Sequence, residues 1–268
     1  MDGAHLRTLG RTGLKVGRLG VASGYGAPAA AFEEAFDRGV NYFYWGSLRR
    51  RAMADAIRHI NARGQRDRLV ILIQSYSRSP LLMERFFHQA LRRLRLDHAD
   101  ILLLGWHNRP PSERLLERAV AMQAKGMFRF LGLSGHHRPL FAELAADETY
   151  DLFHVRYNAV HRGAETEVFD RLPQIGRPGV VTYTATRWGD LLDPRKMPAG
   201  EAPCSAGDCY RFVLSQPSVD VCMTGPKNIA QMREALTALD LGPLPVEALT
   251  RMRRIGDHLH NHHKRLFS

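Results

Sequence analysis

Short apolar runs alternate with longer amphipathic stretches along most of the chain. Runs such as 69–73 and 101–104 are apolar without alternation, which is typical of parallel strands that are buried on both faces. The apolar runs predict eight strands, at 19–23, 41–45, 69–75, 101–104, 128–134, 152–156, 180–184 and 219–224.

Helical periodicity fills the segments between these strands. In the segment 81–94, apolar residues recur as they do on one helical face, at Leu82, Phe86, Ala90, Leu91 and Leu94. The predicted helices are 30–38, 50–63, 81–94, 113–125, 140–146, 165–172, 205–214 and 229–239, followed by a further helix from 245 to about 264. Two short segments within 6–16, around the turn residues 10–13, predict a small β-hairpin.

Eight strand–helix units in a chain of 268 residues predict a closed (β/α)8 barrel of the α/β class. The hairpin precedes the first strand and the extra helix follows the last unit. No linker or low-complexity stretch divides the sequence, so we expect a single domain over 1–268.

Composition excludes several broad classes of protein. Hydrophobic residues make up 44% and charged residues 24% of the chain, which is ordinary globular usage and excludes wholesale disorder. We expect neither a membrane span, because no apolar run reaches about 18 residues, nor a signal peptide, because the N-terminus has no apolar core. The few cysteines, Cys204, Cys209 and Cys222, predict free thiols in the reducing cytoplasm and no metal site.

The chain carries a formal net charge of +11. Most of the excess is arginine spread along the predicted helices, rather than one compact basic run with interleaved aromatic residues. This distribution favours an anionic small molecule, such as a phosphorylated cofactor, over nucleic acid as the partner. The sequence leaves the oligomeric state open.

Several short motifs follow one another in the order of the predicted units. They include Arg-Thr-Leu-Gly-Arg-Thr-Gly-Leu-Lys-Val at 7–16, Arg-Gly-Val-Asn-Tyr-Phe at 38–43, Leu-Gly-Leu-Ser-Gly at 131–135 and Thr-Gly-Pro-Lys-Asn at 224–228, with further matches at 96–104, 157–158 and 181–184. In this order they resemble the aldo-keto reductase superfamily over nearly the whole chain. The resemblance implies the (β/α)8 fold and hydride transfer between NADPH and a carbonyl.

The same resemblance implies four catalytic positions, and this sequence departs from the family at each of them. Tyr44 stands at the position of the family's Asp, Arg49 at that of the catalytic Tyr, Gln74 at that of the Lys and Gly105 at that of the His. The replacements of the Asp and the Lys are consistent with each other, because either charged residue alone would be a buried unpaired charge.

Tyr44 is the candidate acid of this altered site. We expect its phenol to use the space that the absent side chain at Gly105 leaves, with Arg49 as the cationic neighbour that lowers its pKa and Gln74 as a hydrogen-bond donor. His107 is the alternative acid or carbonyl-orienting group. An alternative reading is that Tyr44 only fills a cavity.

The cofactor positions match the family better. By the resemblance, Ser134 and His154 bind the nicotinamide carboxamide, and Tyr183 stacks on the ring. The remaining candidates surround the start of the helix after the last strand, where backbone amides and a lysine would hold phosphate: Gly225, Lys227, Asn228, Gln231, Arg233 and Glu234. The basic Lys227 and Arg233 favour NADP(H) over NAD(H).

The predicted substrate pocket is rich in aromatic residues, as is usual for a cleft that buries a small organic ligand. In addition to the catalytic candidates, its lining is Tyr25, Trp45, Tyr76, Trp106, Tyr157, Arg187 and Trp188. The leading hypothesis is an atypical oxidoreductase that uses NADP(H). The alternatives are a pseudoenzyme that binds a nucleotide or a partner without turnover, and a barrel enzyme of another class, such as a lyase or isomerase.

Overall fold

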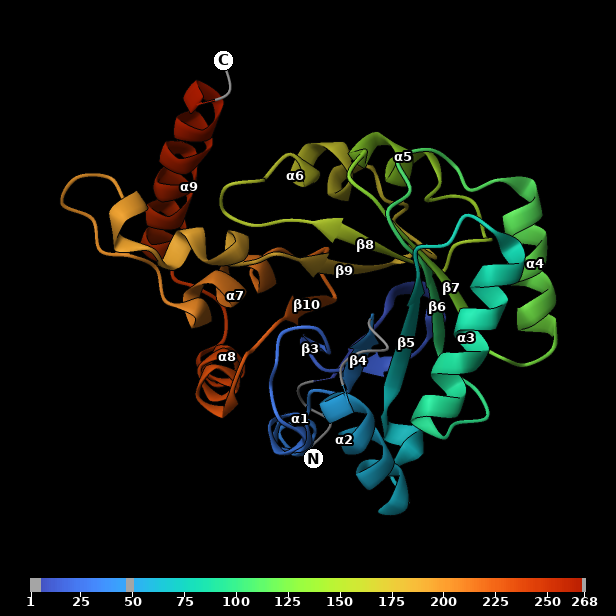
Figure 1. Cartoon of the computed structure of the whole chain (residues 1–268). Coiled ribbons are helices and arrows are strands. Elements are labelled where there is room, and N and C mark those ends of the chain that lie inside the picture. The colour runs from blue at the N-terminus through green and yellow to red at the C-terminus, as the bar shows by residue number, and fades with distance from the viewer. Residues whose placement is uncertain (1–5, 47–50, 267–268) are drawn as a thin grey trace.

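The structure, a computed structural model, describes residues 6–46 and 51–266. Eight parallel strands close into a barrel in the order β10-β3-β4-β5-β6-β7-β8-β9 (Figure 1). The strands are β3 (Leu19–Ala22), β4 (Tyr42–Trp45), β5 (Val70–Ser75), β6 (Ile101–Leu104), β7 (Phe130–Ser134), β8 (Leu152–Arg156), β9 (Gly179–Tyr183) and β10 (Val221–Thr224). The predicted (β/α)8 barrel is confirmed.

Helices connect the strands and surround the barrel. They are α1 (Ala29–Asp37), α2 (Arg51–Ala62), α3 (Pro80–Leu94), α4 (Glu113–Ala124), α5 (Arg138–Glu143), α6 (Ala164–Glu167), α7 (Ala206–Leu214), α8 (Ile229–Leu241) and α9 (Val246–Leu266). Short 3-10 helices lie at Gly10–Thr12, Arg66–Arg68, Phe169–Arg171, Arg187–Leu192 and Pro194–Lys196. The last turns of α9 project beyond the body of the protein (Figure 1). Within the described part of the chain, no helix has the length and apolar character needed to cross a membrane.

The buried face of α3 differs from the predicted one. Met83 and Phe87 are buried together with the predicted Ala90, Leu91 and Leu94. Leu82 and Phe86, which we expected on that face, are each 44% exposed. Adjacent helical residues point about 100° apart. Either Phe86 or Phe87 could therefore belong to the buried face, and in the structure Phe87 packs against the barrel.

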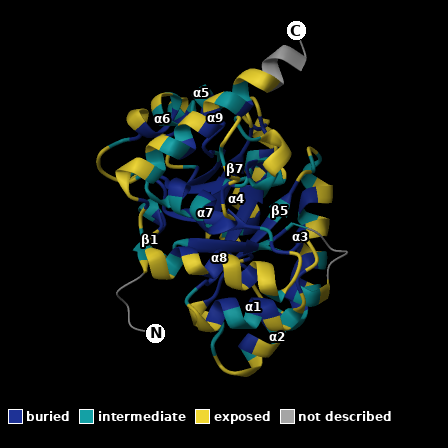
Figure 2. Cartoon of the chain, turned by 90° about the vertical axis from the view of Figure 1, so that its left-hand side faces the viewer, coloured by how far each residue is buried: buried dark blue, intermediate teal, exposed yellow. Residues whose placement is uncertain are grey.

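Strand alternation separates the core into an inner and an outer layer. On β4, Tyr42 and Tyr44 belong to the cluster inside the barrel, whereas Phe43 and Trp45 belong to the larger cluster between the strands and the helices. This is the period of two expected of a strand. The buried strands lie inside and the exposed residues follow the outer faces of the helices (Figure 2).

The bottom of the barrel is closed by the predicted hairpin, which pairs β1 (Arg7–Thr8) with β2 (Lys15–Val16). Leu9 and Val16 are fully buried in the cluster inside the barrel. The hairpin is joined to the barrel by the backbone N–H of Arg11, which donates to the carbonyl of Arg177 at 2.9 Å. Function is therefore expected at the opposite, open end.

A polar residue directly precedes each of the strands β4, β6, β8 and β10. Its side chain accepts a hydrogen bond from a backbone N–H at or near the start of the neighbouring strand, which is β3, β5, β7 or β9 respectively. These bonds satisfy buried donors and fix the strand register at the closed end of the barrel. The pairs are Asn41 with Gly17, Asp100 with Ile71, Asp151 with Leu131 and Asp220 with Val180, at 2.9, 2.8, 2.8 and 2.9 Å.

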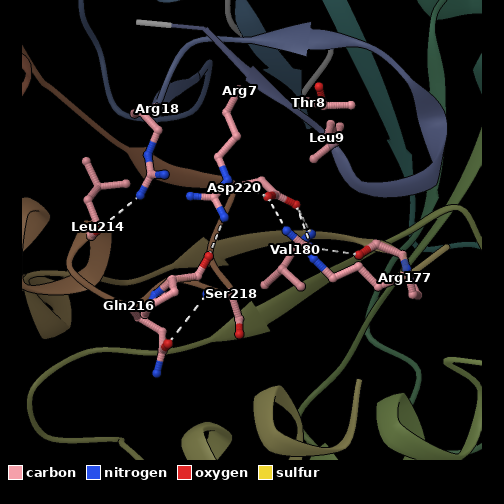
Figure 3. A network of polar contacts seen from close by, with 12 residues as sticks. Arg7, Thr8, Leu9, Arg18, Arg177, Val180, Leu214, Gln216, Ser218 and Asp220 are labelled. Atoms are coloured by element: carbon pink, nitrogen blue, oxygen red, sulfur yellow. Dashed lines mark hydrogen bonds and ion pairs between the residues drawn. The ribbon is translucent and has the colours of Figure 1, made fainter. Parts of the chain in front are cut away.

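Asp220 carries the most extensive of these contacts. Its fully buried carboxylate accepts from Arg7 Nε at 3.1 Å and from two nitrogens of Arg177 at 2.9 and 2.6 Å. Figure 3 shows that Arg7, Arg177 and Val180 converge on this one side chain. The network ties the hairpin to β9 and β10, so the basic residues here have a structural role.

Candidate functional site

The open end of the barrel is formed by the carboxyl ends of the strands. Side chains alternate between the inside and the outside of the barrel along each strand. The last inward-facing positions at the ends of the strands form the mouth of the barrel. They are Ala22, Tyr44, Gln74, Gly105, Ser134, Arg156, Tyr183 and Met223. Of the positions implied by the resemblance, the set contains Tyr44, Gln74, Gly105, Ser134 and Tyr183.

Tyr44 lies above a buried tyrosine–histidine pair. The hydroxyl of Tyr42 is 2.8 Å from Nε2 of His154, and the ring of Tyr44 lies 5.9 Å from the His154 ring. Burial lowers the pKa of His154 to about 3, so this imidazole is neutral at neutral pH. With Nε2 engaged by Tyr42, His154 has only Nδ1 left for any ligand.

The Tyr44 phenol is a weak acid in this setting. Burial, followed by the Tyr76 hydroxyl with which it hydrogen-bonds, raises the pKa of Tyr44 well above its usual value. None of the described residues acts as a cation that opposes this shift. Arg49, the predicted cationic neighbour, lies outside the described residues.

Gln74 fills the space that we expected Tyr44 to use. A β-carbon on Gly105 would stand 2.1 Å from Nε2 of Gln74 and 2.9 Å from Cδ1 of Tyr76. The missing side chain at Gly105 therefore leaves room for Gln74 and Tyr76, which corrects the expectation for Tyr44. Oε1 of Gln74 is buried and has no hydrogen-bond partner in the described part of the structure.

His107 and Ser134 lie together on the neighbouring side of the mouth. The backbone N–H of His107 donates to the Ser134 carbonyl at 2.7 Å, and the N–H of Trp106 donates to Ser134 Oγ at 3.2 Å. Ser134 thus keeps its hydroxyl proton for a ligand. Burial, then the charge of Arg78, lowers the pKa of His107 to about 4, so His107 is neutral at neutral pH and lacks the acidic proton of an imidazolium.

Tyr183 is held as a platform at the mouth. Its hydroxyl donates to the Gly135 carbonyl at 2.9 Å and lies 3.3 Å from Nδ1 of His136, whose ring packs edge-on against it. Burial raises the pKa of Tyr183 to about 12, so the phenol stays protonated. The ring itself is partly exposed.

The loop after β10 leads into α8, as the sequence predicts. Asn228 caps the helix by accepting from the Gln231 N–H at 2.9 Å, and Gln231 Oε1 accepts from the Lys227 N–H at 2.9 Å. Tyr25 covers Gly225 so closely that a β-carbon there would stand 2.5 Å from its ring. The Lys227 amino group has no ion-pair partner among the residues that the structure describes.

Two other predicted cofactor residues already have protein partners. Arg233 Nε donates to Glu34 on α1 at 2.8 Å, and this ion pair holds the pKa of Glu34 below its usual value. Glu234 Oε1 accepts from the Ala206 N–H at 3.1 Å and so caps the first turn of α7. Glu234 must give up this cap to bind a nucleotide, whereas Arg233 uses only Nε and its side chain is 65% exposed.

The predicted aromatic lining divides into two groups. Tyr25, Tyr76, Trp106 and Trp188 are exposed at the mouth, by 40, 56, 61 and 76%. Trp45 and Tyr157 are instead buried in the outer core, and their placement in the pocket is wrong. Tyr157 stacks on Phe212 and donates to Glu165 at 2.6 Å.

Arg156 is a mouth residue that the sequence reasoning missed. It lies two residues after His154 on the same inward face of β8 and pairs in register with Tyr183 on β9. Together with the predicted pocket residues Arg187 and Trp188, it lines a hollow of about 260 Å³. The alternation along β8 would have identified it, because a strand that presents His154 inward also presents Arg156 inward.

Comparison with known proteins gives a match at the level of the fold. No known family profile and no curated protein sequence matches this chain. The apo and holo forms of aldo-keto reductase AKR11C1 from Bacillus halodurans match with TM-scores of 0.73 and 0.74. Both are 19% identical to this chain, and each match covers 93% of this chain and 95% of the other. The chain thus has the fold of an aldo-keto reductase barrel.

Proposed function

We propose that this protein is an oxidoreductase of the aldo-keto reductase type, which binds NADP(H) at the barrel mouth and interconverts the carbonyl and alcohol forms of a small organic substrate. The observation that supports this most is the tethered Tyr183 beside Ser134. A partly exposed aromatic ring, fixed through its hydroxyl and next to a free hydroxyl donor, suits a nicotinamide ring and its carboxamide.

The residues present fit the nicotinamide and phosphate parts of such a cofactor. Ser134 would bind the carboxamide and Tyr183 would stack on the ring. Lys227 and the first backbone N–H groups of α8 would hold phosphate, because a helix N-terminus and an unpaired ammonium both favour an anion. When bound, NADP(H) supplies or accepts the hydride.

The fit is weaker at the adenosine end. Arg233 is paired with Glu34 through Nε, and Glu234 must leave the N-terminus of α7 to bind a nucleotide. Exchange of one anion for another at an exposed arginine is a small change in free energy, because exposed ion pairs contribute about 0–1 kcal/mol. Arg233 therefore remains available to the 2′-phosphate of NADPH, whereas Glu234 is better explained as a helix cap.

In this proposal Tyr44 moves the proton. In carbonyl reduction its Oη donates a proton to the carbonyl oxygen, and it regains one from Tyr76, which is 56% exposed and in contact with solvent. Because burial raises the pKa of Tyr44, the phenol is protonated but gives up its proton slowly. Lack of an efficient general acid typically lowers the rate 10²- to 10⁴-fold.

A second function, nucleotide binding without turnover, is favoured by one specific observation. The described groups nearest to a reacting carbonyl are a buried phenol with a raised pKa and neutral histidines at positions 107 and 154. This arrangement contains no strong acid at neutral pH. A barrel that binds NADP(H) with this set can serve as a sensor or partner-binding protein.

Nitrobenzaldehyde reduction with NADPH distinguishes the two functions. The proposal predicts saturable NADPH binding together with slow reduction, well below the common enzyme turnover number of about 10 s⁻¹. Binding with no turnover over a panel of carbonyl substrates would support the second function. Absence of NADPH binding would contradict both.

A further inference from the structure

The mouth contains an arginine whose charge nothing in the described structure balances. Arg156 makes no ion pair within the described residues, and its Nε is buried without a hydrogen-bond partner. A buried guanidinium N–H without an acceptor is destabilising, because it has lost its hydrogen bonds to water and gained none in return. A ligand with an acceptor atom would satisfy this group.

Arg156 opens into a hollow with the chemistry of an anion site. The hollow has a volume of about 260 Å³ and is lined by Arg156, His161, Thr184, Arg187, Trp188 and Asp190. This volume suits a small polar group and part of a ring, and is smaller than the usual pocket for a drug-sized molecule.

The charges around the hollow leave a positive excess. Arg187 is 9% exposed and donates to Asp190 Oδ2 at 2.5 Å, while Lys196 also pairs with Asp190. The single carboxylate is thus shared by Arg187 and Lys196, and Arg156 has no counter-ion within the described set. Burial, followed by the charges of Arg156 and Arg187, lowers the pKa of His161 to about 4, so this histidine stays neutral and adds no charge.

The backbone at the hollow is held in an unusual conformation. Thr184, Arg187 and Trp188 have φ values of 63°, 50° and 58°, although none is a glycine. Left-handed conformations at residues with side chains cost free energy and cluster where a ligand is bound. Of these residues Arg187 is buried and Trp188 is 76% exposed beside the hollow.

We propose that this hollow binds a carboxylate of the substrate, held by the Arg156 guanidinium with help from Arg187, while the Trp188 ring packs on the adjoining apolar part. A guanidinium binds a carboxylate through two parallel N–H donors. The substrates are therefore small carboxylic acids that also carry a carbonyl or alcohol. The assignment to the substrate rests on the proposed function, but the anion site itself does not.

A phosphate of the nucleotide is the other source of an anion with this chemistry. The geometry favours the substrate, because Arg156 lies level with Tyr183 inside the barrel, whereas the phosphate groups have a separate candidate site at Lys227 and the start of α8. A group that binds Arg156 thus lies beside the predicted nicotinamide platform, where the reacting part of a substrate must be.

Calorimetry with benzoate and its neutral analogue benzamide tests the proposal. In the presence of saturating NADPH, benzoate is expected to bind at least tenfold more tightly than benzamide. Arg156→Gln should lower benzoate affinity at least tenfold and leave benzamide affinity unchanged. Arg114→Gln, which removes an exposed arginine on α4, should match the parent protein.

Three other results would overturn part or all of the proposal. Equal affinity of the parent protein for benzoate and benzamide would overturn the proposal, and this comparison needs no variant to fold. Competition between benzoate and NADPH would assign the hollow to the nucleotide and overturn the substrate assignment. Benzoate binding that depends on Arg156 in a protein without NADPH binding would retain the anion site and contradict the proposed function alone.

Discussion

The side-chain amide of Gln74 occupies the place where a side chain at Gly105 would begin. Nε2 of Gln74 stands 2.1 Å from the position of a β-carbon at residue 105. Gln74 lies on β5 and Gly105 directly follows the neighbouring strand β6, which pairs with β5 up to Leu104 and Ser75. A side chain at residue 105 therefore requires the Gln74 amide to move.

This relationship predicts strong coupling between the two positions. Gly105→Ala should lower the free energy of unfolding by about 1–3 kcal/mol, the usual cost of overpacking. In a Gln74→Ala background the same change should cost less, because the amide no longer obstructs the methyl group and only the Tyr76 ring, 2.9 Å away, must still shift. Urea unfolding of the four proteins measures the coupling, and equal costs in both backgrounds would show that the residues do not compete for space.

Tyr44→Phe tests the proposed proton donor, because it preserves the ring and removes only the hydroxyl. NADPH-dependent reduction of nitrobenzaldehyde should fall at least tenfold, while NADPH affinity changes little. Tyr150→Phe, a buried tyrosine at the closed end of the barrel, provides the matched control and should retain full activity. An unchanged rate for Tyr44→Phe would remove Tyr44 from the mechanism and leave His107 as the group to test.

Lys227→Ala combined with Arg233→Ala should weaken the binding of NADPH more than that of NADH. NADH lacks the 2′-phosphate that these two cations would contact, so the preference for NADPH should fall at least tenfold. Glu34→Gln should have the opposite effect, because it releases Arg233 from its ion pair. Fluorescence titration measures both, and an equal loss for the two nucleotides would show that these residues do not bind that phosphate.

The buried histidine His154 predicts a loss of stability in acid. Its pKa is lowered by burial to about 3 in the folded state, whereas a histidine in the unfolded chain titrates near 6.5. Unfolding therefore takes up a proton between these values, and the stability that is present above about pH 6.5 declines as the pH falls. One such group changes the free energy of unfolding by about 1.4 kcal/mol per pH unit.

His154→Gln tests this account, since glutamine does not titrate and can still hydrogen-bond to Tyr42. Urea unfolding between pH 7 and pH 5 should show a shallower decline for this variant than for the parent protein. His88→Gln, an exposed histidine on α3, is the control. If the free energy of unfolding fell equally with pH in His154→Gln and in the parent protein, other groups would be responsible for the loss of stability in acid.

The strands were predictable because each has a physical signature in the sequence. Parallel strands are covered on both faces, so runs such as Ile101–Leu104 are wholly apolar and end where polar residues begin. The buried face of α3 was less predictable, since Phe86 and Phe87 are equally apolar and only packing against the barrel distinguishes them. Most helices were thus predictable from the sequence and helix orientation was not. The predicted helix 165–172 forms only the short α6, Ala164–Glu167, and the 3-10 turn Phe169–Arg171.

The sequence predicted which strand ends carry the site residues, but it did not predict which side chains contact one another. Trp45 directly follows Tyr44, so the two side chains must point to opposite sides of the sheet, and only one can face the mouth. The same rule excludes Tyr157 once Arg156 is placed inside. Contacts such as Tyr42 with His154 join strands that are far apart in the sequence, and no local pattern indicates them.

The proposed function requires the mouth to bind a nicotinamide nucleotide on Tyr183. Its most direct test is a titration of protein fluorescence with NADPH and NADP⁺, in which Trp106 and Trp188 act as reporters, for the parent protein and for Tyr183→Leu. The account predicts saturable quenching by the parent, and an affinity about two- to tenfold weaker in the variant because a stacked aromatic contact is lost. No saturable change up to about 1 mM nucleotide, the upper end of ordinary KM values, would contradict it.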